Sequence, residues 1–116
     1  MNNSLLLSKS KSLALETIKV CKEIKLKDRE WTLTNQLMRS GTSVGANIRE
    51  AQYAHSKADF VAKLQIALKE CAESEYWIEL LVESGYHIDI TILAQCREMK
   101  HILIASLNTA KGNMER

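Results

Sequence analysis

The chain has no proline and only four glycines in 116 residues, and this scarcity of turn formers constrains its fold more than any other feature. A β-rich fold needs many tight turns, which draw on glycine and proline, so the sequence argues against an all-β protein. Hydrophobic residues make up 46% of the chain but aromatic residues only 5%, so the core must be largely aliphatic, as in helix bundles. We therefore expect an all-α fold in a single domain, because a chain of this length leaves little room for a second one.

Apolar residues recur at helical spacing in four segments, residues 4–24, 31–54, 57–84 and 89–111. The connections between them are short, which should make neighbouring helices antiparallel. The sequence thus predicts a single antiparallel up-down four-helix bundle over residues 1–116. Ser56 and Gly85 are expected to begin and end the third helix as its N-cap and C′ residue, and Gly112 to end the fourth. The charged stretch 25–29 is expected to be the first connection.

Cysteine usage and hydropathy predict a cytoplasmic protein. No run of about 18 apolar residues is present to span a membrane, and the N-terminus lacks the long apolar region of a signal peptide. The three cysteines, Cys21, Cys71 and Cys96, are odd in number and widely spaced, which predicts reduced, buried thiols rather than disulfides or a metal site.

A motif in the second helical segment, QLMRSGTSVGANIREA over residues 36–51, resembles the signature of the small bacterial 23S rRNA intervening-sequence proteins, roughly QLxRSxxSVxxNIxEG. Ala51 stands where that pattern often has glycine. Residues 56–60 with Leu64, Ala67, Glu73 and Glu75 are similar to the family's third helix, so the resemblance covers about residues 4–111. The matching motif positions are Gln36, Leu37, Arg39, Ser40, Ser43, Val44, Asn47, Ile48 and Glu50.

The resemblance implies a four-helix bundle that assembles as a ring, typically a homopentamer, with no catalytic activity. Distantly similar bundle proteins bind nucleic acid. The charge distribution is compatible with such a partner, since residues 1–30 carry a net charge of +3 and residues 61–86 a net charge of −3. Lys11, Lys22 and Arg29 share a helical face and could contact phosphates, with Arg49 as a further candidate. The alternative is an ordinary solvated face.

Several motif residues are polar and need partners. Ser40, Ser43, Asn47 and Glu50 form a stripe beside the apolar one, which suits either hydrogen bonds at the core edge or a nucleotide-binding groove. Glu75 lies at the edge of the core stripe of its helix, and Arg39 is its expected partner.

Two further features point to close contacts between helices or between subunits. Gly41 and Gly45 each cost about 1 kcal/mol in a helix, so we expect another helix to approach them closely, either within the chain or in a neighbouring copy. Apolar residues that lie off the core stripes predict an oligomer interface formed by Ile66, Trp77, Trp31 and Tyr53.

Signatures of enzymes and metal sites are missing. The sequence has no GxGxxG, GxxxxGK[ST] or HExxH motif, and the lone ExxH of Glu98 and His101 is half of a di-iron site. We therefore expect no enzyme, cofactor or metal. The predicted function is that of a homo-oligomeric binding or scaffold protein with RNA or DNA as its leading partner. The alternatives are a purely structural or protein-interaction ring and, more weakly, an uncharacterised enzyme.

Overall fold

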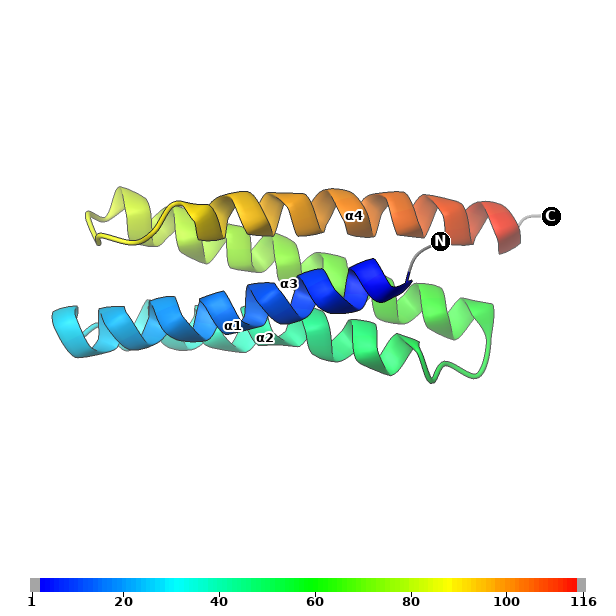
Figure 1. Cartoon of the computed structure of the whole chain (residues 1–116), viewed down its shortest axis with the longest axis horizontal. Helices are drawn as coiled ribbons and strands as arrows, with labels where there is room; N and C mark the ends of the chain where they lie inside the picture. The colour runs from blue at the N-terminus through cyan, green and yellow to red at the C-terminus, as the bar shows by residue number, and fades with distance from the viewer. Residues whose placement is uncertain (1–2, 115–116) are drawn as a thin grey trace.

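The computed structural model describes residues 3–114, which form four helices: α1 (Asn3–Asp28), α2 (Thr32–Ala51), α3 (Lys57–Glu83) and α4 (Thr91–Met114). The helices lie side by side in an up-down arrangement, and the first and last helices bring the two ends of the chain to the same end of the bundle (Figure 1). Each helix packs on its neighbour in the sequence, and α1 closes the bundle against α4 along its most loosely packed seam. The rod measures 51 × 21 × 20 Å. The predicted all-α four-helix bundle is confirmed.

Four helix boundaries differ from the prediction by two residues or more. The first helix continues to Asp28, because the lysines and leucine of residues 25–28 are good helix formers, and the chain turns only at Arg29, which has a φ of 57°. The second helix ends at Ala51 rather than at residue 54. The amides of the three residues after Ala51 donate to carbonyls only three positions back, so they form turns rather than α-helix. The fourth helix begins at Thr91 and passes through Gly112 to Met114, so that glycine does not end it.

The predicted caps of α3 are confirmed. The Ser56 hydroxyl accepts a hydrogen bond from the Asp59 amide at 3.0 Å, which satisfies one of the free donors of the first turn. At the other end Gly85 has a φ of 96° and donates to the Val82 carbonyl at 3.1 Å, while the Tyr86 amide donates to the Leu81 carbonyl at 3.0 Å. These two bonds form a Schellman motif, which requires the left-handed conformation that glycine adopts without strain.

The core is aliphatic, as composition predicts, and the two motif glycines bring α2 close to α1. A Cβ atom on Gly41 would lie only 2.7 Å from the Cγ2 and Oγ1 atoms of Thr17, and one on Gly45 would lie 3.3 Å from the Ser10 Oγ. The close approach expected of these glycines is therefore met inside the chain. The largest fully buried side chains come from all four helices: Leu6, Leu13, Ile24, Leu37, Val44, Ile48, Leu64, Ile78, Leu81, Ile92, Met99 and Leu103.

All three cysteines are free and buried, as expected. Burial raises the pKa of the Cys21 thiol to about 11. The Sγ atoms of Cys71 and Cys96 lie 3.7 Å apart in the α3–α4 seam, and each thiol donates to the other residue's carbonyl at 3.2 Å. Within residues 3–114, no helix combines the length and the apolarity that crossing a bilayer requires.

Candidate nucleic-acid interface

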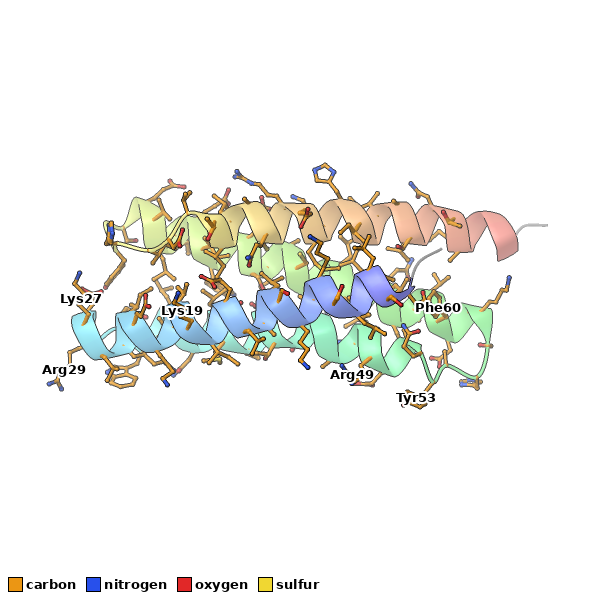
Figure 2. The ribbon with its side chains drawn as sticks, viewed as in Figure 1. Lys19, Lys27, Arg29, Arg49, Tyr53 and Phe60 are labelled. Atoms are coloured by element: carbon orange, nitrogen blue, oxygen red, sulfur yellow. The ribbon has the colours of Figure 1, made fainter. Side chains whose placement is uncertain are left out.

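The predicted cations lie along the outer surface of α1 and α2. Lys11 of α1 and Arg49 of α2 line the same shallow hollow of about 180 Å³ in the seam between the two helices. Lys22 follows Lys11 by eleven residues, which keeps both on one face of α1. Arg29 lies just beyond the helix with a φ of 57°, so the prediction that it shares their helical face is wrong. Figure 2 shows Arg49 and Arg29 pointing away from the same edge of the bundle, with Arg29 at its end.

Lys25 belongs to this surface as well, although the sequence pattern predicted that it lies in a connection. In the structure it occupies the last turn of α1, and its Nζ lies 5.7 Å from the centre of the Trp31 ring. The signal that could have found it is its spacing of fourteen residues from Lys11, which is close to four helical turns. We call the surface formed by Lys11, Lys22, Lys25, Arg29 and Arg49 the α1–α2 basic face.

The carboxylates of α1 are turned away from this face. Glu16 and Glu23 follow Lys9 at intervals of seven residues, and Lys9 pairs with Glu98 of α4 at 3.3 Å, so this row faces the α4 side. Asp28 lines a separate hollow together with His87, at the end of the bundle where α3 connects to α4.

The carboxylates near α2 already have partners within the chain. Glu50 pairs with Lys63 of α3 at 3.2 Å. Glu30 precedes α2 and accepts hydrogen bonds from the amides of Leu33 at 2.7 Å and Thr34 at 2.9 Å. Burial raises the pKa of Glu30, but these backbone hydrogen bonds outweigh it and hold the pKa below its ordinary value. Among the described residues, none of the five cations of the basic face forms an ion pair.

The polar stripe of α2 is satisfied within the chain. The Ser43 hydroxyl donates to the Arg39 carbonyl at 2.7 Å, and the Asn47 amide donates to the Ser43 carbonyl at 2.8 Å. Ser40 is fully buried, and its hydroxyl accepts from Ser74 of α3 at 2.8 Å. These contacts correspond to the core-edge interpretation of the motif rather than to an open groove.

The prediction that Glu75 pairs with Arg39 is wrong. Arg39 donates to Glu70 at 3.1 Å and also pairs with Glu73. Glu75 instead accepts from Lys100 at 2.6 Å and from Arg97 of α4. The reason is rotation: two residues along a helix turn the side chain by about 200°, so Glu73 and Glu75 lie on opposite edges of α3, one facing α2 and the other facing α4.

The environment of Glu75 stabilises its charged form. The hydrogen bond from Lys100, and then that from Arg97, lower the pKa of the Glu75 carboxyl below its ordinary value of 4.5. The side chain of Glu75 is only 15% exposed, whereas Arg97 is half exposed. This arrangement fits a structural clamp between α3 and α4.

The four residues predicted to form an oligomer interface do not make one patch. Trp77 packs against the core, and its Nε1 donates to Glu73 at 3.0 Å, so the premise that the monomer core leaves it unused is wrong. Ile66 is partly exposed on the outer face of α3. Trp31 and Tyr53 flank α2 at opposite ends and are far more exposed, at 54% and 86%.

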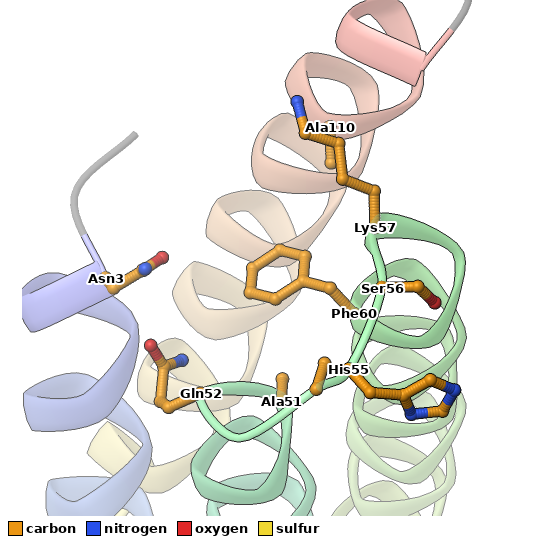
Figure 3. Close-up of a pocket in the computed structure, with 9 residues that line it drawn as sticks. Asn3, Ala51, Gln52, His55, Ser56, Lys57, Phe60 and Ala110 are labelled. Atoms are coloured by element: carbon orange, nitrogen blue, oxygen red, sulfur yellow. The ribbon is translucent and has the colours of Figure 1, made fainter.

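A hollow of about 440 Å³ lies at the end of the bundle that carries the α2–α3 connection. Figure 3 shows the Phe60 ring in it and His55 turned away from it. The hydroxyl of Ser56 is engaged in capping α3, and His55 is paired with Asp59 at 3.3 Å. The described lining therefore offers no nucleophile held by a base. Residues 3–114 likewise contain no group of three or more His, Cys, Asp or Glu side chains placed to hold a metal ion.

Comparisons with known proteins agree with this architecture. The family model described as 23S rRNA-intervening sequence protein matches residues 2–108. A crystal structure of a protein of unknown function from the S23 ribosomal protein family of Bacteroides thetaiotaomicron VPI-5482 is 39% identical in sequence. It superposes with a TM-score of 0.89 over 93% of this chain and 99% of that one. Among curated proteins there is no match.

Proposed function

Since this chain belongs to the 23S rRNA-intervening sequence protein family, we propose that it is a non-enzymatic protein that binds RNA or DNA on its α1–α2 basic face. The observation that carries the proposal is the gathering of five cations on one surface whose neighbouring carboxylates are turned away or engaged. Such cations supply the sequence-independent part of nucleic-acid affinity by displacing counterions from phosphates. The three buried, free thiols support a reducing compartment such as the cytoplasm.

The site is long enough to meet several phosphates. Eighteen residues separate Lys11 from Arg29, which is about 27 Å along a helix at 1.5 Å per residue. Around the middle of α1 the row is bordered by the exposed Leu15 and Ile18 rather than by acidic side chains. An extended polyanion can therefore follow α1 without meeting a like charge.

Self-association is part of the same proposal. On α3 the side chains of Ile66 and Tyr76 are 39% and 53% exposed. Exposed apolar and aromatic side chains are enriched at interfaces, and the family resemblance favours a ring of five copies. A ring would repeat the basic face and so strengthen the binding of a long polyanion.

Binding of RNA and DNA oligonucleotides measured across salt concentrations tests the proposal. Changing Lys11, Lys22 and Arg29 together to glutamine should weaken binding and flatten the salt slope by about one unit for each phosphate that is no longer bound. A matched triple variant that removes the exposed Lys57, Lys69 and Lys111 elsewhere should keep the slope. No binding by the unmodified protein at low salt would refute the proposal, and equal effects of the two triple variants would move the site.

Light scattering coupled to size exclusion tests the ring. The chain has a mass of 13.1 kDa, so five copies would scatter with about five times that mass. Tyr76→Glu should dissociate the assembly, whereas Leu15→Glu places the same charge on α1 and should not. A monomer mass at micromolar concentration would contradict self-association.

A further inference from the structure

Trp31 and Tyr53 are the two aromatic side chains that the fold leaves most exposed, and both border the α1–α2 basic face. Trp31 immediately precedes α2 and Tyr53 lies in the turn just after it. They are 54% and 86% exposed. Neither is needed for the core, whose apolar residues are supplied by the inner faces of the helices.

Both rings stand next to cations of that face. Lys25 holds its ammonium 5.7 Å from the centre of the Trp31 ring, within the range of a cation–π contact. Arg49 precedes Tyr53 by four residues, and Figure 2 shows the two side chains projecting from the same edge of the bundle. Each end of α2 therefore presents an aromatic surface beside a positive charge.

Part of the surface between the two rings is a shallow hollow whose lining includes three small residues. The hollow of about 180 Å³ that Lys11 and Arg49 border has Ala14, Gly45 and Ala46 in its lining. Twenty-two residues separate Trp31 from Tyr53, or about 33 Å at helical rise. A chain of several nucleotides is required to reach from one ring to the other.

Exposed rings distinguish between the forms of nucleic acid. A duplex hides the faces of its bases and offers phosphates, for which cations alone suffice. A single strand offers both phosphates and unpaired bases, and proteins that bind single strands combine a basic groove with aromatic side chains on which bases stack. The charge of the face and its two flanking aromatics together fit the second form.

We infer that the α1–α2 basic face binds single-stranded nucleic acid, with Trp31 and Tyr53 stacking on unpaired bases while Lys11 and Arg49 contact phosphates between them. This inference rests on the proposed function, because it assigns the form of the polyanion that the same cations bind. It also moves Trp31 and Tyr53 from the predicted subunit interface to the ligand site.

The test compares a single-stranded oligonucleotide with the duplex it forms with its complement, in RNA and in DNA. The single strand should bind more tightly, and Trp31→Leu and Tyr53→Leu should each weaken its binding by about 5- to 150-fold, the range found for one base–aromatic stack. The salt slope should stay unchanged, because every cation that meets a phosphate is retained. Ile104→Ala is the control, since it removes an exposed apolar side chain from α4, away from both the basic face and the α3 surface proposed for self-association.

Fluorescence gives a second readout that does not depend on affinity. In a Trp77→Phe background Trp31 is the only remaining tryptophan, and its emission should be quenched by the single strand and not by the duplex. Circular dichroism and light scattering of each variant check that the fold and the assembly are intact.

The outcomes separate the two proposals. If the protein binds a duplex as tightly as a single strand, or if both leucine variants bind normally, the stacking inference fails while the proposed function stands. If Trp31→Leu or Tyr53→Leu dissociates the assembly, these residues belong to the subunit interface and the inference is overturned. If neither nucleic acid binds at low salt, the proposed function fails and the inference fails with it.

Discussion

The close approach of α2 to α1 at Gly41 can be tested by adding one methyl group. In an open helix, Gly→Ala stabilises a protein by about 1 kcal/mol, because alanine has the higher helix propensity. Here the new Cβ would stand 2.7 Å from both Cγ2 and Oγ1 of Thr17, closer than such atoms can lie. Thr17 cannot easily turn aside, since it is buried and its hydroxyl donates to the Leu13 carbonyl at 2.7 Å.

The expected change in the free energy of unfolding follows from these two opposing effects. Overpacking of a core typically costs about 1–3 kcal/mol, so after the propensity gain Gly41→Ala should destabilise the protein by about 1 kcal/mol. Gly45→Ala is the matched control. Its Cβ would meet Ser10 at 3.3 Å or more, so most of the propensity gain should remain and the variant should be neutral or slightly more stable.

Urea unfolding followed by circular dichroism measures both variants, and Thr17→Ala completes a double-mutant cycle. In the Thr17→Ala background the nearest contact relaxes to the Cβ position at 3.2 Å, so Gly41→Ala should become neutral or stabilising, with a coupling energy of about 1 kcal/mol or more. The reasoning is refuted if Gly41→Ala stabilises the unmodified protein by about 1 kcal/mol. A lower mass of Gly41→Ala than of the unmodified protein in light scattering would instead place the glycine at a subunit contact.

Two further predictions concern charged residues. Arg29 has a φ of 57°, a conformation that costs a non-glycine residue about 1–2 kcal/mol. Arg29→Gly should therefore be about 1 kcal/mol more stable than Arg29→Ala in urea unfolding, while both bind nucleic acid more weakly than the unmodified protein; equal stabilities would rule out strain at this position. Glu75→Gln should lose about 1–2 kcal/mol at pH 7, because Lys100 and Arg97 lose their shared partner. The pKa of Glu75 is lowered by folding, so its stabilisation is present above the ordinary value of 4.5 and is lost as the pH falls below it. The free energies of unfolding of the unmodified protein and of Glu75→Gln should therefore converge as the pH falls below that value. A difference that persists in acid would contradict the role assigned to the charged Glu75.

The candidate site could be predicted only in part from the sequence. The common face of Lys11 and Lys22 follows from helical periodicity within one segment, as does the outward position of Arg49, whereas Arg29 lies beyond the end of α1 and is placed by the turn. Lys25 was missed because the first helix runs four residues further than expected. Lys11 and Arg49 border one hollow because of the way α1 and α2 are rotated against each other. Neither helical segment specifies that rotation by itself.

The sequence by itself determined the class of fold, the four helices and their inner faces, because these depend on local spacing, turn formers and capping residues such as Ser56 and Gly85. Only the tertiary structure decided which helices meet at which residues. It paired Arg39 with Glu70 and Glu73 rather than with Glu75, and it placed Gly41 against Thr17. Such contacts depend on the relative rotation and axial register of separate helices, and those are fixed by the packing of the whole core rather than by any one segment.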